Sequence, residues 1–277
     1  MKIGICGLGL IGGSLAKAYK RAGIDVLGYD INTAVTDYAV MAKIIDKPLT
    51  NERVCECDYI FVALYPEAVV NYIKSIAPFV KKGTVVVDLC GTKMNVCPQC
   101  FEIAEEYDFD FVGGHPMAGT QFSGLKNAKE DLFDGATMIL VPKPDEDLHL
   151  LARLKEALVV AGFGSVTLST AQIHDVNIAY TSQLAHVVSN AYVKSPRSKV
   201  HKGFSAGSYK DLTRVAWLNE KMWTELFMAN AENLITEIEL LTENLKKYSD
   251  ALRSGDAVKI EELLREGRLI KEAVDSK

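Results

Sequence analysis

The sequence predicts an α/β domain built on a parallel sheet, followed by an all-helical domain. Short runs rich in Val and Ile alternate with helical periods as far as about residue 168. Strands that alternate with helices form right-handed βαβ units around a parallel sheet. From about residue 170 no convincing strand appears and helical periods run to the C-terminus, so the predicted domains are 1–168 and 169–277.

Apolar runs predict the strands of the first domain, at residues 2–6, 26–30, 58–64, 84–88, 110–112, 137–141 and 165–168. The run 59–63 is apolar throughout, which is typical of a strand that is buried on both faces of a parallel sheet. Spacing of three and four residues predicts helices over 11–22 and 146–161.

The second domain is predicted to consist of long helices over 173–193, 219–248 and 256–274. An apolar stripe runs along the middle helix at Leu234, Ile238, Leu241 and Leu245. These Leu-rich helices exceed what one small helical domain would bury. Because symmetric dimers are the commonest oligomers, we expect a homodimer formed through the C-terminal helices.

Composition excludes several classes of function. The net charge is −5 and there is no block of Lys and Arg, so no nucleic-acid partner is expected. No apolar run approaches the ~18–20 residues that a membrane span needs. The chain opens directly into a predicted strand, without the apolar segment of a signal peptide. We therefore expect a cytoplasmic protein.

The six cysteines are interpreted as reduced thiols. Cys97 and Cys100 form a C-x-x-C pair, for which a redox role or half of a zinc site is the alternative. Cys55 and Cys57 would complete four ligands, but they are separated by one residue, whereas zinc sites usually have gaps of two to four. No metal is therefore expected.

A glycine-rich turn follows the first predicted strand and opens the first helix. It has the pattern G-x-G-x-x-G and consists of Gly7, Leu8, Gly9, Leu10, Ile11 and Gly12. In such a turn Gly7 permits the tight bend, Gly9 admits a pyrophosphate, and Gly12 lets the helix pack against the strand. The helix N-terminus favours negative charge. The pattern predicts a Rossmann-type dinucleotide site.

An acidic residue about 20 positions further on completes that site. Asp30 lies at the tip of the second strand, where its carboxylate can accept hydrogen bonds from the ribose hydroxyls of NAD. A 2′-phosphate would meet the carboxylate as a like charge, and the next residues, Ile31, Asn32 and Thr33, are not basic. The sequence favours NAD over NADP. The alternative is a glycine-rich turn in another α/β protein.

His115 follows the predicted strand 110–112, at the edge where open α/β sheets bind ligands. Gly113 and Gly114 precede it and leave room for substrate and cofactor, and Pro116 restricts its backbone. A histidine at this position can take a proton from an alcohol while hydride leaves the same carbon. The alternative is a histidine that bonds a loop carbonyl. His149, His174 and His201 carry no functional expectation.

Five motifs together resemble the prephenate/arogenate dehydrogenases of tyrosine biosynthesis. They are G-L-G-L-I-G-G-S-L, G-Y-D, D-x-x-G-T-K at 88–93, G-G-H-P-M-A-G-T at 113–120 and Y-K-D-L-T-R at 209–214, and the match runs in order to about residue 235. The resemblance implies an NAD-binding domain, a helical dimerisation domain, and oxidative decarboxylation of a cyclohexadienol. His115 would be the catalytic base, with prephenate or arogenate as the substrate.

The resemblance also implies substrate-binding residues. Arg214 would bind a carboxylate through its planar fork, although a surface ion pair with Asp211 is the alternative. His186 would lie near the substrate, or else in a contact between domains. Lys93 would approach the nicotinamide or a substrate carboxylate, or else lie in solvent. The remaining expected substrate contacts are Thr120 and Gln121.

The chain departs from the family at three positions. Many relatives have serine at the position of Gly91, so a hydroxyl contact is absent unless Thr92 supplies it. Some relatives have histidine at Gln183 and glutamate at Gln121. A carboxylate at position 121 would pair with the ammonium of arogenate, whereas a neutral amide would not. Gln121 therefore favours prephenate.

Other proteins that join a G-x-G-x-x-G domain to a helical domain are the competing interpretations. A β-hydroxyacid dehydrogenase or imine reductase leaves the G-G-H-P motif unexplained, and Lys194 and Lys199, which flank the Ser195-Pro196 break, are poorly placed for the lysine of such an enzyme. A non-catalytic NAD-sensing protein would keep Gly9 and Asp30 but would not need His115.

Overall fold

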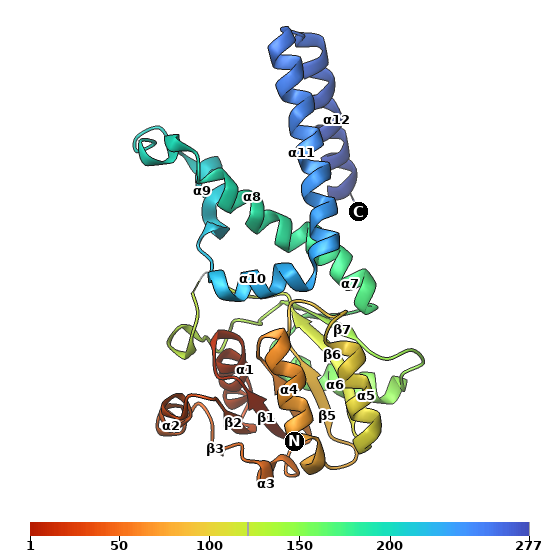
Figure 1. The fold of residues 1–277 in the computed structure, drawn as a ribbon. Helices are drawn as coiled ribbons and strands as arrows, with labels where there is room; N and C mark the ends of the chain where they lie inside the picture. Colours follow the sequence, from red (N-terminus) through yellow and green to blue (C-terminus); the bar gives the residue numbers. More distant parts are fainter. Residues whose placement is uncertain (121, 277) are drawn as a thin grey trace. The chain divides into compact units, whose positions relative to one another are not determined.

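The computed structural model describes residues 1–120 and 122–276. They form two compact units, Met1–Asn230 and Ala231–Lys277 (Figure 1). The first unit contains the sheet and the helices as far as α10. The second is a pair of helices.

The first unit is built on an eight-stranded sheet in the order β3-β2-β1-β4-β5-β6-β7-β8. Neighbouring strands are parallel except β6 and β7. This confirms the predicted Rossmann-type sheet, with one antiparallel pair that was not predicted. The strands are β1 (Lys2–Cys6), β2 (Asp25–Tyr29), β3 (Lys47–Pro48), β4 (Tyr59–Val62), β5 (Val85–Asp88), β6 (Asp110–Pro116), β7 (Thr137–Val141) and β8 (Ser165–Leu168).

The register brings the carboxyl ends of the central strands to one edge. Cys6 of β1 pairs with Val62 of β4, Val62 pairs with Asp88 of β5, and Asp88 pairs with Gly113 of β6. The strand order reverses direction between β1 and β4, which is where open α/β sheets bind ligands. The segments that follow these strands therefore meet at one place.

Helices cover both faces of the sheet because its central strands are apolar on both sides. In β5, Val85 and Val87 face one cluster of buried residues and Val86 faces the other. The first cluster includes residues of α1 (Leu10–Arg21), α2 (Thr33–Met41) and α6 (Leu148–Val160), and the second includes residues of α3 (Asn51–Val54), α4 (Pro66–Ile76) and α5 (Cys97–Tyr107).

The later helices of the first unit begin after β8. One continuous helix consists of α7 (Ala171–Ile178), a π-helical turn η3 (Ala179–Leu184) and α8 (Ala185–Tyr192). The short helix α9 (Gly207–Thr213) and the helix α10 (Glu220–Ala229) follow. Single 3-10 turns complete the unit, at η1 (Ala77–Phe79), η2 (Leu125–Asn127), η4 (Pro196–Lys199) and η5 (Arg214–Ala216).

The second unit is a helical hairpin of α11 (Ala231–Ser254) and α12 (Ala257–Asp275). The predicted helix 219–248 is therefore two helices, α10 and α11, which are separated at Asn230. In the hairpin turn Gly255 has a φ of +69°, and Asp256 caps α12 by accepting a hydrogen bond from the backbone N–H of Lys259. Within the described residues, no helix combines the length and apolar character required to span a bilayer.

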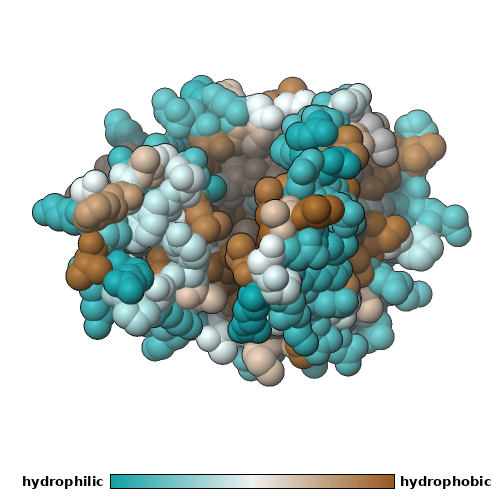
Figure 2. Space-filling model, turned by 90° about the horizontal axis from the view of Figure 1, so that it is seen from above, coloured by the Kyte–Doolittle hydropathy of each residue, from teal (hydrophilic) through white to brown (hydrophobic). Residues whose placement is uncertain are grey.

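Large apolar side chains remain exposed on the hairpin. Figure 2 shows hydrophobic side chains at the surface between hydrophilic ones. The exposed apolar residues of the two helices are Ile235, Leu240, Leu245, Leu252, Val258, Leu264, Leu269, Ile270 and Val274. Such a surface is typical of a protein–protein contact.

The glycine turn offers a test of the packing of α1 against β1. A Cβ on Gly12 would lie 1.9 Å from the backbone O of Gly7, whereas a Cβ on Gly9 would have no heavy atom within 4 Å. We expect Gly12→Ala to lower the free energy of unfolding by about 1–3 kcal/mol through overpacking. Gly9→Ala should change it by less than about 1 kcal/mol. Urea denaturation measures both, and equal losses would contradict the steric argument.

Candidate active site

The glycine turn leaves the N-terminus of α1 open. Gly7 has a φ of +84° and its N–H donates to the backbone O of Tyr29 at 2.8 Å, which closes the turn against β2. Gly9 occupies the N-cap position and no side chain caps the helix. The free N–H groups and the helix dipole favour an anion at this point. The open space at Gly9 and the close contact at Gly12 match the tasks that the sequence assigns to these glycines.

The carboxylate of Asp30 is held against the glycine turn. Its Oδ2 accepts a hydrogen bond from the N–H of Leu8 at 2.9 Å, and its Oδ1 accepts one from Asn32 at 2.9 Å. Each carboxylate oxygen has a further lone pair, so the group can still accept hydrogen bonds from a ribose. Asp30 thus lies beside the turn at the ends of β1 and β2, where a dinucleotide would place its ribose.

His115 lies within a strand, which corrects the prediction of a loop after residue 112. Residues 113–116 pair with the antiparallel strand β7, with His115 opposite Ile139. This pairing extends β6 beyond the end of β5, because Asp88 is the last residue of β5 and pairs with Gly113. The half-buried side chain of His115 therefore projects from a hydrogen-bonded strand at the ligand-binding edge.

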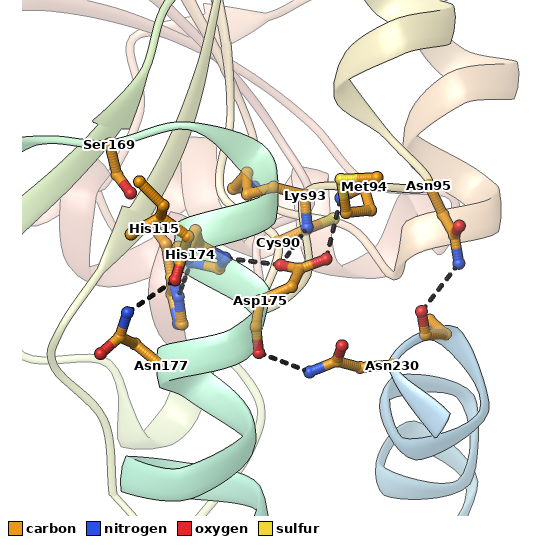
Figure 3. Close-up of polar contacts among 12 residues, drawn as sticks. Cys90, Lys93, Met94, Asn95, His115, Ser169, His174, Asp175, Asn177 and Asn230 are labelled. Atoms are coloured by element: carbon orange, nitrogen blue, oxygen red, sulfur yellow. Dashed lines mark hydrogen bonds and ion pairs between the residues drawn. The ribbon is translucent and has the colours of Figure 1, made fainter. Parts of the chain in front are cut away.

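A chain of hydrogen bonds leads from His115 to α7 (Figure 3). Nδ1 of His115 lies 2.8 Å from Nε2 of His174, and Nδ1 of His174 lies 2.6 Å from Oδ1 of Asp175. The carboxylate of Asp175 accepts two backbone hydrogen bonds, from the N–H of Lys93 at 2.8 Å and from that of Met94 at 2.9 Å. His174 and Asp175 were not among the predicted site residues.

The other ring nitrogen of His115 faces Gly91. Nε2 lies 4.0 Å from the position that a Cβ on Gly91 would occupy, so a serine at this position would place its hydroxyl close to the imidazole. Burial lowers the pKa of His115 well below 6.5, and the charge of Lys93 lowers it further. The imidazole is therefore neutral at pH 7 and can accept a proton.

Lys93 is occupied by a buried ion pair. Its Nζ contacts Oδ2 of Asp88, and both side chains are fully buried. Burial lowers the pKa of Lys93, but the charge of Asp88 outweighs this effect and the pKa is raised. The carboxylate of Asp88 also accepts hydrogen bonds from the N–H groups of Gly114 and Cys90, at 3.2 Å and 3.0 Å. This arrangement does not support direct substrate binding by Lys93.

Thr92 has a buried hydroxyl next to this ion pair. Its Oγ1 has no hydrogen-bond partner within the part of the chain that the structure describes. Gly91 lacks a side chain, so Thr92 carries the hydroxyl nearest in sequence to the position where relatives have serine. This placement keeps open the predicted replacement of that serine by Thr92.

His186 is oriented by two contacts. Its Nδ1 donates to the backbone O of Ser182 at 2.9 Å, and its ring stacks on Trp223 with 3.7 Å between centroids. Burial lowers the pKa of His186, and the charge of Arg214 lowers it further. The neutral ring therefore presents Nε2 as a hydrogen-bond acceptor or a contact for a ligand.

Arg214 is exposed and carries no ion pair with any carboxylate of the described residues, Asp211 included. The alternative that the sequence offered for Arg214 is therefore absent. Helix α8, which carries His186, packs against the turn η5, which begins at Arg214, so the two residues lie in the same region. A cation beside a neutral imidazole is suited to binding a carboxylate that carries a neighbouring polar group.

The π-helical turn η3 changes which face of the helix His186 occupies. His186 follows His174 by twelve residues. A regular α-helix would place two such residues about 120° apart. One wide turn takes up an extra residue, which reduces the angle to about 20°. The turn thus brings both histidines to nearly the same face.

Buried polar contacts stabilise the wide turn. Gln183 donates from Nε2 to the backbone O of Leu226 at 3.1 Å, and its Oε1 accepts from Asn230 at 2.9 Å. Asn230 also donates to the backbone O of Asp175 at 2.8 Å. The sequence contains no periodic signal for a π turn, because the pattern of apolar residues across it still resembles an α-helix.

Two predicted contacts lie on the segment after β6. Thr120 is exposed, and its Oγ1 accepts from the N–H of Phe122 at 3.3 Å. Gln121 lies outside the described residues. The cysteines are all free thiols. Burial raises the pKa of Cys97 and raises that of Cys100 to about 12, so neither carries the thiolate that redox chemistry needs.

The buried ion pair can be tested against an exposed one. Lys93→Met would leave the carboxylate of Asp88 buried without its cation, so we expect the free energy of unfolding to fall by about 3–5 kcal/mol. The matched control is Lys82→Met, because Lys82 pairs with Asp108 at 2.8 Å while their side chains are 80% and 73% exposed. That change should cost less than about 1 kcal/mol. Urea denaturation compares them, and a loss for Lys93→Met as small as the control's would contradict this account.

Two family models match the chain. Residues 15–166 match the nucleotide-binding domain of prephenate dehydrogenase, and residues 170–266 match the prephenate dehydrogenase dimerization domain. Together these matches cover most of the chain, and the glycine motif at residues 7–12 lies just before the first of them. The first match ends at residue 166, within β8, and the second begins at residue 170, just before α7.

Individual relatives agree with these matches. The chain is 30% identical to a prephenate dehydrogenase of Lactococcus lactis subsp. cremoris, over 99% of this chain and 77% of that protein. It is 29% identical to a cyclohexadienyl dehydrogenase of Zymomonas mobilis, over 92% of this chain and 89% of that protein. Among solved structures, the chain aligns with the prephenate dehydrogenase of Aquifex aeolicus in complex with hydroxyphenyl propionate and NAD⁺, with a TM-score of 0.81. The two are 27% identical, and the alignment covers 99% of this chain and 98% of that one. The motifs, the sheet with its appended helices and the matched domains lead to one conclusion: the chain belongs to the prephenate dehydrogenase family.

Proposed function

We propose that this protein is an NAD-dependent dehydrogenase that converts prephenate to 4-hydroxyphenylpyruvate by oxidative decarboxylation. The observation that carries this proposal is the neutral imidazole of His115, whose Nε2 faces the backbone of Gly91 on the same sheet edge as the glycine turn. A proton acceptor at that edge is what the oxidation of an alcohol by a dinucleotide requires. Membership of the prephenate dehydrogenase family identifies the alcohol.

The residues at the glycine turn fit NAD. The open N-terminus of α1 would bind the pyrophosphate, with Gly9 admitting it and Gly7 and Gly12 shaping the turn, and Asp30 would accept hydrogen bonds from the ribose. The backbone of Leu8, Leu10 and Ile11 completes the turn. When bound, NAD⁺ supplies the acceptor for the hydride. The A. aeolicus relative was solved with NAD⁺, which supports this choice.

His115 accepts a proton early in the reaction and returns it at the end. Its Nε2 takes the proton of the 4-hydroxyl as a hydride leaves the same ring carbon, and a dienone forms. The bond to the ring carboxylate then breaks, CO₂ leaves, and the electron pair of that bond makes the ring aromatic as a phenolate. His115 returns its proton to the phenolate oxygen, so no net proton is gained or lost. A base that is neutral at pH 7 suits both steps.

Arg214 and His186 are the side chains that we expect to bind the substrate. Arg214 presents a guanidinium that has no ion-pair partner among the described residues, which suits bidentate binding of a carboxylate, and the ring of His186 is held in the same region by stacking on Trp223. Thr120 and Gln121 would contact the substrate from the segment after β6. Lys93 would act indirectly, because its ammonium is paired with Asp88.

Arogenate is the alternative substrate. The Zymomonas relative is a cyclohexadienyl dehydrogenase, which keeps this alternative open. The neutral amide of Gln121 favours prephenate, because arogenate carries an ammonium that a carboxylate would bind better.

We also infer that the protein is a homodimer whose domains divide at residue 168. The dimerization-domain match and the exposed apolar residues of α11 and α12 support pairing through the C-terminal helices. The boundary is supported by the positions where the two family matches end and begin. The free thiols of all six cysteines favour a reducing compartment such as the cytoplasm.

A steady-state assay with NAD and prephenate tests the proposed reaction. We expect turnover by the wild type, followed through NADH absorbance, and a fall of about 10²–10⁴-fold in kcat for His115→Asn, because asparagine cannot accept the proton. The dissociation constant of NAD should be unchanged. Since burial and the charge of Lys93 lower the pKa of His115, kcat/KM of the wild type should decline only well below the usual histidine value of 6.5.

Parallel assays with arogenate and with NADP separate the alternatives. Faster turnover of arogenate would identify the other substrate, and a preference for NADP would contradict the role of Asp30. An NAD-binding protein that turns over neither substrate would instead fit a sensor.

The role of Arg214 predicts an effect on KM. Arg214→Lys keeps the charge and removes the planar fork, so we expect KM for prephenate to rise by roughly 10- to 100-fold, which corresponds to a charge-assisted hydrogen bond. The matched control is Arg268→Lys, because Arg268 pairs with Glu272 on the exposed surface of α12. Steady-state kinetics should show no change for the control. An unchanged KM for Arg214→Lys would remove Arg214 from the substrate site.

A further inference from the structure

We propose that Asp175 and His174 are positioning residues that set the proton of His115 on Nδ1, and so keep Nε2 free to act as the base. This inference rests on the proposed function for its catalytic meaning. The tautomer itself is a property of the protein without substrate, so it can be measured independently of any reaction.

Asp175 forms one end of the chain of hydrogen bonds, and it fixes which atom of each pair donates and which accepts. Its side chain is fully buried, and both carboxylate oxygens face backbone N–H donors, from Lys93 and Met94. A carboxylate in these contacts acts only as an acceptor of hydrogen bonds. Oδ1 must therefore accept from Nδ1 of His174, which lies 2.6 Å away.

The position of the proton on His174 in turn determines the position of the proton on His115. An imidazole of His174 that carries its one proton on Nδ1 has a lone pair on Nε2. That lone pair lies 2.8 Å from Nδ1 of His115, which must donate to it. A neutral His115 that donates from Nδ1 has its lone pair on Nε2, and Nε2 is the atom that faces Gly91. If His174 carried its proton on Nε2 instead, the lone pair on its Nδ1 would face a lone pair of the Asp175 carboxylate.

Neighbouring residues hold His174 and Asp175 in place at the start of α7. His174 is 2% exposed and lies in the first turn of α7, which Thr170 caps through the N–H of Ile173. Asn230 donates to the backbone O of Asp175 from the end of α10. The buried environment excludes water that would otherwise offer the imidazole nitrogens other partners.

The arrangement also assists the charged state of His115. When Nε2 takes a proton, the imidazolium strengthens its hydrogen bond from Nδ1 to His174, and the carboxylate of Asp175 lies at the far end with the opposite charge. Serine protease triads use a carboxylate behind a histidine in this way, and the wrong tautomer there costs roughly 10⁴-fold in kcat. Here a second histidine lies between the carboxylate and the base.

The test compares His174→Leu with His174→Gln. Glutamine can accept the hydrogen bond from Nδ1 of His115 through Oε1, whereas leucine offers no acceptor. Selective ¹⁵N labelling of histidine reports the tautomer of each ring, and the chain has five histidines, so the spectrum can be assigned by substitution. His149→Leu and His149→Gln are the matched controls, because His149 is exposed on α6.

The wild type without ligand should show the proton of His115 on Nδ1, and His174→Gln should keep it there. In His174→Leu the proton should move largely to Nε2, and kcat for prephenate should fall by roughly 10- to 100-fold, while KM and the dissociation constant of NAD change by less than about twofold. His174→Gln should retain a kcat within about tenfold of the wild type. The controls should match the wild type in every measurement.

A proton on Nε2 of His115 in the unliganded wild type would overturn the proposal, as would equal kcat values for the leucine and glutamine variants. If His174→Leu does not fold, the wild-type tautomer and the kcat of His174→Gln still decide the matter. Failure of the wild type to oxidise prephenate would overturn the proposed function alone, because the tautomer is measured without substrate.

Discussion

The buried ion pair between Asp88 and Lys93 joins the parts of the site. Asp88 ends β5 and bonds the backbone of Gly114, so it holds the strand that carries His115. Lys93 lies five residues later, and its own N–H bonds the carboxylate of Asp175 on α7. The short segment from Asp88 to Lys93 therefore holds both the strand that carries His115 and the carboxylate of Asp175. Because both charges are fully buried, the loss of either would leave an uncompensated charge, and this makes the segment rigid.

The cofactor site depends on a different constraint, which is steric. The close approach of α1 to β1 requires the absence of a Cβ at Gly12, and the space above the turn requires its absence at Gly9. The parallel register then places this turn and the segment after β5 at the same edge of the sheet. Hydride and proton transfer need reacting groups within a few ångströms of one another. The register of the sheet is what makes that proximity possible.

The helical part of the first unit completes the site through an irregularity. A regular α-helix would turn His174 and His186 to different faces, but the π turn η3 brings them to nearly the same one. Gln183 and Asn230 bind the wide turn through buried hydrogen bonds. Some relatives have histidine at the position of Gln183, whereas here this residue stabilises the wide turn. π-helical turns of this kind often occur at functional sites.

The sequence by itself determined the sheet, the glycine turn and the placement of Asp30 and His115 at the ligand-binding edge, because these depend on local periodicity and on residues that lie close together in the chain. It did not determine that His115 lies within β6, because the extension of that strand depends on pairing with β7. It did not identify His174 and Asp175 either, since their contacts join residues more than fifty positions apart. Long-range pairing and burial leave no periodic trace in a single sequence, so only the tertiary structure decided which polar groups contact His115 and that the cation of Lys93 is paired with Asp88.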